Sequence, residues 1–513
     1  MLFRFEEDAV WTKLLEGDWV TVDKLLCIHD PGRAQDYSFR AGMWDGLKHF
    51  FDKDKQRLPS GLFPRLELRL KNRGHEVQCS VTTTVTLGLC KPTEPDCLEG
   101  IDLRDYQVQG INAALEFRRG ILWQATNSGK GESISAITAN LFRQLGLEGI
   151  IIVPNLTVLM ELGKRLPLRL GGNPKVVVWN KAKKVGPVTI VTAQSIDTEM
   201  RLKGERSKLI EFLHECNYVL SDESHHCAAP SYQKIMQAAQ NAFWRIGFTG
   251  TADKATKRKD AEVVAKSKDG ARWHRWHMEQ FLGPVIDRID NAFMIEKGYS
   301  AKPKIVVIDD RNCFGPTVIT PKGKITADGS YEPPPNLYGK VFKLAATQDT
   351  KWIKNVCKCI RLLTQAKKPP FVFTHSIEHI EAIEAMCKER GIECKVLHGK
   401  HSDDQRIKVL KEYGEKQDFA VITSTIFSEG LSIQGMRSLI LAGARKTPVE
   451  LLQRIGRGIR AKEEDNTVLI VDFVPSHSDM LRRHALERLA VYRDQGFEIV
   501  SVKDVMRLTE FLL

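Results

Sequence analysis

A loop at residues 125–130, with the sequence ATNSGK, constrains the fold of this chain more than any other feature. It follows an apolar stretch at 120–123 and precedes a helical pattern at 133–145. In a strand, loop and helix of this kind, backbone N–H groups and the helix amino terminus surround phosphates, and the lysine reaches the terminal ones. A surface turn is the alternative, because Gly-Lys pairs are common in turns. The pattern favours a phosphate-binding site at Lys130.

Two adjacent carboxylates, Asp222 and Glu223, follow the apolar stretch 218–221 and lie 92 residues beyond Lys130. At such a site Asp222 holds Mg²⁺, usually through water, and Glu223 orients and deprotonates the attacking water. A solvated acidic pair is the alternative. The apolar strand before the pair argues against it, because α/β sheets bind ligands at the carboxyl ends of their strands.

The third motif, QRIGRGIR at residues 453–460, lies in a helical segment that begins near Pro448. Arg457 and Arg460 are three residues apart, so they share one helix face and can both point at a γ-phosphate. A solvated basic face would look the same in isolation. The combination with the two earlier motifs favours one ATP site divided between two parts of the chain.

The ordered motifs resemble those of superfamily 2 helicases and translocases over roughly residues 100–475. The resemblance implies an α/β fold with two RecA-like parallel-sheet motor domains that use ATP and Mg²⁺. In the first domain, residues 103–107 resemble the segment that reads adenine, residues 153–155 and 191–195 resemble the motifs that contact the nucleic-acid strand, and residues 247–252 resemble the coupling motif. Motifs of the second domain are resembled by residues 371–374, 398–399, 423–425 and 429–431.

The resemblance also implies roles for individual residues. ATP would bind between the motor domains, so that the arginines complete the site only on closure and hydrolysis drives alternating grips on one strand. The direction in related motors is 3′ to 5′. The expected catalytic residues are Glu223, Asp222, Arg457, Arg460 and Gln453; the nucleotide-binding residues are Gln107, Thr126, Asn127, Ser128, Gly129, Lys130, Gly131, Glu429 and Gly430; the metal residue is Asp222, through water; and the nucleic-acid residues are Arg40, Trp44, Pro154, Asn155, Gln194, Thr374 and Thr423.

Two motifs ahead of the motor, FRAGMWDG at 39–46 and LPSGL at 58–62, resemble the small α+β DNA-binding domain of UvsW-type bacteriophage helicases. The resemblance implies an ATP-dependent DNA helicase or translocase that unwinds and branch-migrates forks, D-loops, R-loops and four-way junctions in recombination, repair or replication. Individually, Trp44 and Gly46 are also typical core and turn residues of any small domain. The pairing of the two motifs carries the resemblance.

Two positions depart from the family pattern. Gly131 stands where Thr or Ser usually ligates Mg²⁺, so one metal ligand is missing. Water could fill that position, or Glu132 or Ser133 could supply an oxygen; we expect ATP hydrolysis to survive. Asn127 stands where glycine is usual, and Asn is the residue besides glycine that best tolerates a left-handed backbone.

Length and charge agree with this assignment. A chain of 513 residues predicts about three domains. We place them at 1–95, 96–296 and 297–513, the last with carboxyl-terminal helices. A formal net charge of +12 favours a polyanionic partner, and therefore DNA, both single-stranded and branched.

A basic and aromatic segment at 253–290 has two interpretations. Its residues Arg272, Trp273, Arg275 and Trp276 could stack on bases or follow phosphates. Alternatively, an amphipathic helix packs its two tryptophans on the motor.

Cysteine usage and hydropathy suggest the compartment. The eleven cysteines show no paired C-x-x-C framework and are read as reduced thiols, and no zinc is predicted. No apolar run approaches the roughly 20 residues that span a bilayer. We expect a cytoplasmic monomer, in the host cytoplasm if phage-encoded, with recombination or replication proteins as potential partners.

Three alternatives remain open at this point. Gly131 motivates a nucleic-acid-binding protein with an inactive ATP site. An RNA helicase is the second, although the DESH sequence at 222–225 and the amino-terminal motifs favour DNA. The third is the motor subunit of a restriction complex, which would need a partner chain for cleavage.

Overall fold

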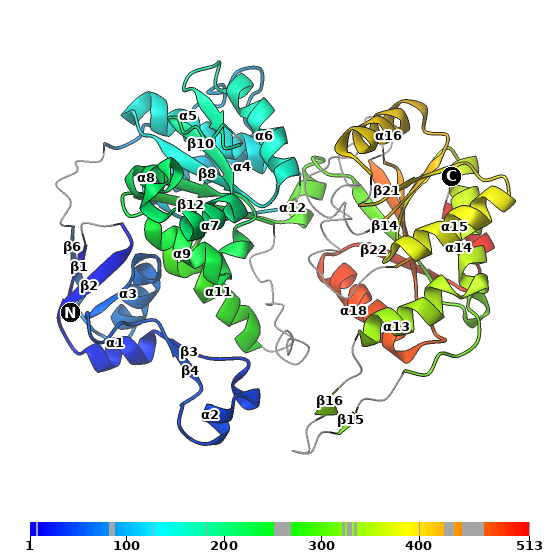
Figure 1. The fold of residues 1–513 in the computed structure, drawn as a ribbon, viewed down its shortest axis with the longest axis horizontal. Coiled ribbons are helices and arrows are strands. Elements are labelled where there is room, and N and C mark those ends of the chain that lie inside the picture. Colours follow the sequence, from blue (N-terminus) through cyan, green and yellow to red (C-terminus); the bar gives the residue numbers. More distant parts are fainter. Residues whose placement is uncertain are drawn as a thin grey trace. The chain divides into compact units, whose positions relative to one another are not determined.

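The computed structural model divides into two compact units, residues 1–290 and 291–513, which are described separately (Figure 1). Both contain a large parallel sheet with helices on its two faces, which confirms the predicted fold class. None of the described helices is both long enough and apolar enough to cross a membrane. The described residues are 1–6, 9–81, 88–125, 127–180, 182–250, 268–320, 324–325, 331–332, 336–399, 401–424, 436–443 and 466–511.

The first part of unit 1 is a small α+β layer. Its sheet has the order β5-β2-β1-β6, in which β1 pairs antiparallel with β2 and parallel with β6. Phe3, Leu58 and Leu66 are fully buried between this sheet and its helices. A separate β3-β4 hairpin carries α2 between its strands. The elements are β1 (Leu2–Phe5), β2 (Trp11–Glu16), α1 (Trp19–Leu25), β3 (Cys27–His29), η1 (Arg33–Gln35), α2 (Tyr37–Arg40), β4 (Leu47–His49), β5 (Arg57–Pro59), η2 (Ser60–Leu62), α3 (Phe63–Lys71) and β6 (Gln78–Val81).

The second part of unit 1 is a seven-stranded parallel sheet, ordered β13-β7-β12-β11-β8-β10-β9. Strands buried on both faces are apolar throughout, as in GIIIV at 149–153. Ile150 and Ile152 face one core, and Ile151 and Val153 face the other. The strands are β7 (Arg119–Gln124), β8 (Gly149–Val153), β9 (Val176–Val178), β10 (Val188–Thr192), β11 (Tyr218–Ser221), β12 (Trp244–Thr249) and β13 (Val285–Ile289).

Helices cover both faces of this sheet (Figure 1). Residues of α4, α5 and α6 pack on one face, and residues of α7, α8, α9 and α11 pack on the other. The loops that follow the strands are therefore left at the sheet edges, where functional residues can be exposed. The elements are α4 (Asp105–Phe117), α5 (Lys130–Leu145), α6 (Leu156–Arg169), α7 (Ala193–Leu202), η3 (Gly204–Arg206), α8 (Lys208–Glu215), η4 (Ser224–Ala228), α9 (Pro230–Ala238) and α11 (Lys268–Leu282).

Unit 2 contains the second parallel sheet, ordered β18-β19-β17-β20-β21-β14-β22. The central strands, such as SLIL at 438–441, are again apolar and fully buried. A short antiparallel pair, β15 with β16, lies between β14 and β17 along the chain. The strands are β14 (Lys302–Ile308), β15 (Lys324–Ile325), β16 (Tyr331–Glu332), β17 (Pro370–Phe373), β18 (Cys394–Leu397), β19 (Ala420–Thr423), β20 (Ser438–Leu441), β21 (Thr467–Phe473) and β22 (Glu498–Val502).

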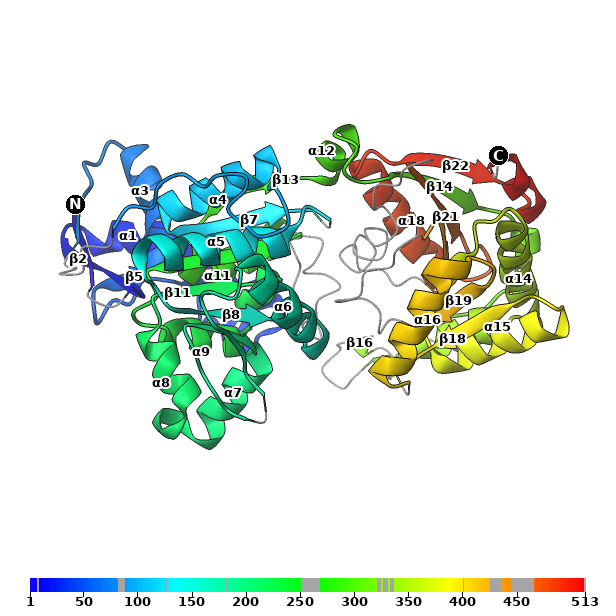
Figure 2. The same cartoon turned by 90° about the horizontal axis from the view of Figure 1, so that it is seen from above.

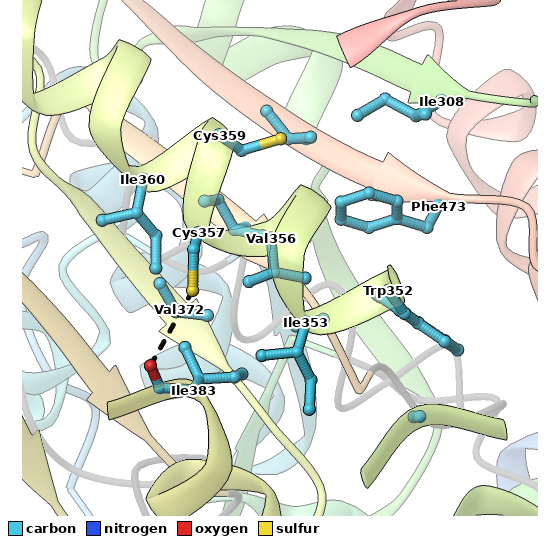
Figure 3. Close-up of a cluster of buried hydrophobic side chains, with 14 of the residues drawn as sticks. Ile308, Trp352, Ile353, Val356, Cys357, Cys359, Ile360, Val372, Ile383 and Phe473 are labelled. Atoms are coloured by element: carbon cyan, nitrogen blue, oxygen red, sulfur yellow. Dashed lines mark hydrogen bonds between the residues drawn. The ribbon is translucent and has the colours of Figure 1, made fainter. Parts of the chain in front are cut away.

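The helices of unit 2 form two layers, with α14 and α15 on one side of the sheet and α16 and α18 on the other (Figure 2). On the α14 side, Val356 and Ile360 pack near Val372 and Phe473 (Figure 3). The elements are α12 (Asn291–Glu296), η5 (Arg311–Cys313), α13 (Leu337–Phe342), the π-helical turn η6 (Lys343–Thr347), α14 (Thr350–Gln365), α15 (Ile377–Glu389), α16 (Asp403–Lys416), α18 (Asp479–Asp494) and η8 (Val505–Phe511).

Six of the eleven cysteines are buried in the cores, and Cys79 is exposed. All eleven are free thiols. Cys357 and Cys359 are fully buried on α14, and the Cys357 thiol donates to the carbonyl of Ile383 at 3.8 Å (Figure 3). The hydrogen bond with Cys357 raises the pKa of Cys387, and burial raises that of Cys216, which keeps these thiols protonated and unreactive.

Helix α11 joins the two parts of unit 1. Trp276 is only 1% exposed and lies in the hydrophobic core of the amino-terminal layer, 5.6 Å from the ring of Phe50. The guanidinium groups of Arg65 and Arg69 lie over the Trp276 ring at 5.3 and 4.7 Å. Trp276 therefore has a packing role and cannot stack on bases. The packing interpretation of the basic and aromatic segment is correct for this residue, but its partner is the amino-terminal layer.

The LPSGL motif of the amino-terminal layer also packs against α11. A Cβ at Gly61 would overlap the backbone carbonyl of Glu279 and lie 2.8 Å from the carbonyl carbon of Gln280, so η2 approaches α11 closely only because residue 61 is glycine. Arg65 Nε also donates to Glu279 at 2.9 Å, and the Glu279 side chain is buried. A buried ion pair and a close backbone contact thus fix the amino-terminal layer on the motor sheet.

Replacing Gly61 by alanine is expected to destabilise unit 1 by about 1–3 kcal/mol, because the added methyl group meets backbone atoms that cannot rotate away. Calorimetric thermal unfolding would measure the loss. Leu68→Ala is the control, since Leu68 is exposed on the adjacent helix α3. Equal unfolding temperatures for Gly61→Ala and Leu68→Ala would show that the contact contributes nothing to stability.

Candidate active site

The phosphate-binding loop follows β7 and leads directly into α5. Gly129 caps α5 with a φ of 81°, and Asn127 has a φ of 70°. Both values lie in the left-handed region, so Asn127 adopts the conformation expected of it at a position where glycine is usual. The loop leads straight into the amino terminus of α5, the end of a helix that favours phosphate oxygens.

Gln107 and Lys130 lie at this loop. Gln107 is buried on α4, and its amide nitrogen donates to the carbonyl of Ser128 at 3.1 Å and to that of Gly129 at 3.3 Å. Its amide oxygen accepts from the N–H of Arg104 at 2.9 Å. Lys130 Nζ donates to the carbonyls of Gln124 and Ala125 at 3.2 and 3.3 Å. Gln107 thus ties α4 to the loop, and its contacts in this structure are with the loop backbone.

The two carboxylates lie at the carboxyl end of β11, as the sequence pattern predicts. Burial and the charge of Glu223 raise the pKa of Asp222, while Lys130 acts in the opposite direction. Burial also acts to raise the pKa of Glu223, but His225 and Lys130 outweigh it and hold that pKa below its ordinary value. Glu223 therefore remains ionised, and the two adjacent carboxylates concentrate negative charge in a partly buried place.

This negative charge suits a divalent cation. Asp222 supplies a carboxylate, the hard oxygen ligand that Mg²⁺ prefers, and the ion normally completes its shell with waters and substrate phosphates. Among the described residues, no group of three or more His, Cys, Asp or Glu side chains could hold a metal on its own. The residues fit Mg²⁺ bound mainly by nucleotide and water, with Asp222 as the protein contribution.

Two histidines, His225 and His274, connect the carboxylates to neighbouring elements. The sequence did not predict these contacts. His225 Nδ1 lies 3.1 Å from Glu223 Oε2 and 3.2 Å from Thr249 Oγ1, in the predicted coupling motif. On the other side, His274 Nε2 of α11 lies 2.9 Å from the carbonyl of His225. Glu223 itself has a φ of 46°, a strained conformation for a non-glycine residue that these contacts support.

Glu132 and Ser133, the two residues that could replace the missing metal ligand, both lie in the first turn of α5. Glu132 accepts from Arg169 Nε at 3.0 Å, and its side chain is largely buried. Ser133 is fully buried in α5. The suggestion that one of them ligates Mg²⁺ stays a prediction.

The nucleic-acid candidates of the first motor sheet lie at the ends of neighbouring strands. Pro154 and Asn155 follow β8, Gln194 follows β10, and these strands are adjacent and parallel. Asn155 caps α6 by accepting from the N–H of Val158 at 3.0 Å, whereas Gln194 is exposed. The three positions therefore share one edge of the sheet.

In unit 2, Thr374 and Thr423 are also brought together at the ends of adjacent strands, β17 and β19. Both side chains are fully buried. The Thr374 hydroxyl donates to the carbonyl of Thr423 at 3.2 Å, and the Thr423 hydroxyl donates to that of Ser424 at 3.3 Å. Their hydroxyls thus bond to the chain itself and fix the shape of the strand ends.

In the amino-terminal layer, Arg40 is exposed on α2 and Trp44 is half-buried, with its indole N–H donating to the carbonyl of Leu47 at 3.0 Å. Gly46 has a φ of 74°, and a Cβ there would lie 2.7 Å from the Phe39 ring, so it is a turn residue. Beside them, Tyr37 is 72% exposed and Met43 is 68% exposed. The sequence motif includes Met43 but gave no signal for Tyr37.

Several predicted site residues lie outside the described part of the chain. They are Thr126, Glu429, Gly430, Gln453, Arg457 and Arg460.

Comparison with known proteins decides the family. The type III restriction enzyme res subunit family matches residues 100–254, and the helicase conserved C-terminal domain family matches 352–462. The chain is 22% identical over 502 residues to the ATP-dependent DNA helicase UvsW of Enterobacteria phage T4, which covers 90% of this chain and 91% of that protein. It belongs to the superfamily 2 helicases.

A second relative of this helicase is the DNA 3′-5′ translocase XPB2 of Sulfurisphaera tokodaii, 21% identical over 391 residues and covering 73% of this chain and 82% of that protein. The solved structure of S. cerevisiae Dbp5 bound to RNA and ADP BeF3 shares the fold, with a TM-score of 0.53, 12% identity, and coverage of 81% of this chain and 94% of that one. The two parallel sheets are therefore RecA-like, and the helicase hydrolyses ATP.

Replacing Asp222 by Asn is expected to stabilise the helicase at pH 8, by on the order of 1 kcal/mol, while abolishing ATP hydrolysis. The pKa of Asp222 rises from 3.8 to about 6, so the folded chain holds this proton more tightly than the unfolded chain. The free energy of unfolding of the wild type therefore falls as pH rises through this interval, and the uncharged Asn avoids that loss.

Thermal unfolding of both proteins at pH 4 and pH 8 would measure the difference. Glu223→Gln is the matched control: its lowered pKa means that the ionised form stabilises the fold, so this variant should lose stability at pH 8. An Asp222→Asn variant that is less stable than wild type at pH 8 would contradict the assigned charge balance.

Proposed function

We propose that this helicase is a DNA motor that unwinds and branch-migrates branched DNA, such as forks, D-loops, R-loops and four-way junctions, in recombination, repair or replication. The observation that carries the proposal is the similarity to the phage DNA helicase over 90% of the chain. About a tenth of this chain lies outside the alignment, which is fewer residues than the 95 ahead of the motor. The similarity therefore includes part of the amino-terminal layer as well as the ATPase.

The packing of that layer supports the same proposal. Trp276 and Glu279 on α11 belong to the motor helices, yet their side chains contact Phe50 and Arg65 of the amino-terminal layer. An element fixed to a motor domain in this way moves with it on DNA. We place the domain boundaries near residues 95 and 296 and propose that the helicase acts as a monomer.

In the proposed hydrolysis step, the loop at 127–130 and the first turn of α5 bind the phosphates, and Lys130 neutralises their charge. Gln107 sets the position of the loop and reads the adenine. Glu223, kept ionised by His225, orients the water and takes its proton. Mg²⁺, held by Asp222 through water, would supply charge stabilisation to the phosphates. Arg457 and Arg460 of the second motor domain contribute further positive charge.

Nucleic-acid contact is assigned to the strand ends of both sheets. Pro154, Asn155 and Gln194 present one edge of the first sheet, and Thr374 and Thr423 shape the corresponding loops of the second. Related motors move 3′ to 5′, and the printed name of the archaeal relative states that direction for that protein. We propose the same direction here.

The amino-terminal contact is assigned to α2 and the residues after it. Tyr37, Arg40 and Met43 are all exposed on this short segment. An exposed aromatic ring beside an arginine can stack on an unpaired base while the guanidinium binds a phosphate. A branched substrate offers such bases at its junction.

The second candidate function is that of a motor subunit in a restriction complex. The family that matches residues 100–254 is named after the res subunit of type III restriction enzymes. Such a subunit would be stimulated by linear duplex DNA and not selectively by a junction. The substrate preference therefore separates the two candidates.

ATP hydrolysis should be stimulated by DNA, most strongly by a four-way junction, and weakly by single-stranded RNA. Phosphate release would be measured without nucleic acid and with single-stranded DNA, single-stranded RNA, linear duplex and junction, and strand separation of a labelled junction would be followed in parallel. Lys130→Ala is the control that removes hydrolysis. Equal stimulation by linear duplex and junction would argue for the restriction motor, and stimulation by RNA alone would overturn the DNA assignment.

Arg457→Ala in the same assays should lower turnover by about 10³-fold or more, because an arginine that contacts the transferred phosphoryl group has an effect of this size. DNA affinity should stay near the wild-type value. A proportional loss of DNA affinity would instead identify Arg457 as a nucleic-acid residue.

The double substitution Tyr37→Ala with Arg40→Ala should weaken binding to a four-way junction by about tenfold, from the loss of one stacking contact and one phosphate contact. Binding would be measured by fluorescence anisotropy at fixed salt. Arg73→Ala, an exposed arginine elsewhere in the same layer, controls for the change in charge. If Arg73→Ala has the same effect as the double variant, α2 has no specific role.

A further inference from the structure

Gly131 departs from the helicase pattern, and the structure shows which side chain approaches its position. Gly131 is the second residue of α5, directly after Lys130. A Cβ built on it would overlap Nη2 of Arg165 and lie 2.9 Å from Cζ of the same guanidinium. The space that a Thr or Ser side chain would enter is therefore taken by the end of an arginine from α6.

The surroundings of Arg165 hold it in this direction. Its Nη1 lies 3.5 Å from Oε1 of Glu161, one turn earlier on α6, and its Nε lies 3.8 Å from Oε1 of Glu132. The second oxygen of Glu132 accepts from Arg169 at 3.0 Å. These contacts involve Nη1 and Nε, and they leave the Nη2 end of the guanidinium against the phosphate-binding loop.

Arg165 also acts electrostatically on Asp222. Burial and Glu223 raise the pKa of Asp222, and Arg165 is one of the two cations, with Lys130, that oppose this rise. A guanidinium has five N–H donors and no acceptor, so it cannot ligate a metal ion as a hydroxyl does. It can instead bind phosphate oxygens directly, through charge-assisted hydrogen bonds.

We propose that Arg165 is a nucleotide-positioning residue that replaces the missing metal-binding hydroxyl by contacting the phosphates of the bound nucleotide. The exchange of a metal ligand for a cation makes nucleotide binding less dependent on Mg²⁺ than it would be with Thr at position 131. This inference rests on ATP binding at the loop, which the family shows, and it is independent of the kind of DNA on which the helicase acts.

The test measures nucleotide affinity without hydrolysis. Binding of a fluorescent ADP analogue to the full-length protein would be titrated in Mg²⁺ and in EDTA. The Kd ratio, which is the Kd in EDTA divided by the Kd in Mg²⁺, gives the Mg²⁺ dependence. Arg165→Ala should weaken binding in EDTA by about tenfold, since a hydrogen bond to a charged group is lost. Arg165→Gln, which keeps most of the side-chain volume, should show the same loss and guards against a folding defect.

Gly131→Thr supplies an independent second arm. The atom that its Cβ meets is the end of a flexible side chain, so Arg165 can swing away and the fold is retained. The Kd ratio should then increase, because a hydroxyl has replaced the guanidinium, and adding Arg165→Ala to Gly131→Thr should cause little further change in EDTA. The two substitutions are therefore expected to be non-additive.

Arg169→Ala is the matched control. Arg169 shares Glu132 with Arg165, but its Nη1 donates to the carbonyl of Glu99 at 3.0 Å, so its role is structural. Its Kd ratio should equal that of the wild type. If Arg165→Ala and Arg165→Gln also leave both Kd values unchanged, or if Gly131→Thr leaves the ratio unchanged, the proposal is wrong and Arg165 only pairs with Glu132 and Glu161.

Discussion

Two adjacent, partly buried carboxylates at the end of β11 are the constraint around which the candidate active site is built. Asp222 and Glu223 are adjacent, and each disfavours ionisation of the other in a poorly solvated place. Lys130 approaches from the end of β7, and His225 comes from the turn that follows the pair. The loops after β7 and β11 emerge at the same side of one parallel sheet, so the sheet brings Lys130 to the carboxylates although they are 92 residues apart in the sequence.

Close packing between distant parts of the sequence is the second organising feature. Gly61 and Glu279 are more than 200 residues apart, yet the backbone of η2 lies against that of α11 only because position 61 lacks a side chain. The LPSGL motif therefore has a local physical meaning: it permits the docking of the amino-terminal layer. The neighbouring WDG motif has a different one, since Gly46 forms the turn that supports Phe39 and Trp44.

The sequence predicted what depends on local patterns and missed what depends on contacts across the sheet. The strand, loop and helix around Lys130 and the position of Asp222 after β11 follow from short patterns of apolar and polar residues. Arg165 lies 34 residues beyond Gly131, on a helix whose orientation only the folded sheet determines, so no local pattern linked the two. Trp276 was ambiguous for the same reason, because an aromatic ring beside arginines looks alike whether it packs on protein or on bases.

Helix α11 has an implication for how mechanical load is distributed in unit 1. Near its middle it carries Trp276 into the amino-terminal core, and half a turn earlier His274 contacts the carbonyl of His225, which in turn lies against Glu223. One helix thus contacts the amino-terminal layer directly and, through His225, the proposed general base Glu223. If the proposed DNA contact of α2 and the proposed role of Glu223 both hold, a displacement of the amino-terminal layer on DNA would be passed to Glu223 through Trp276, His274 and His225.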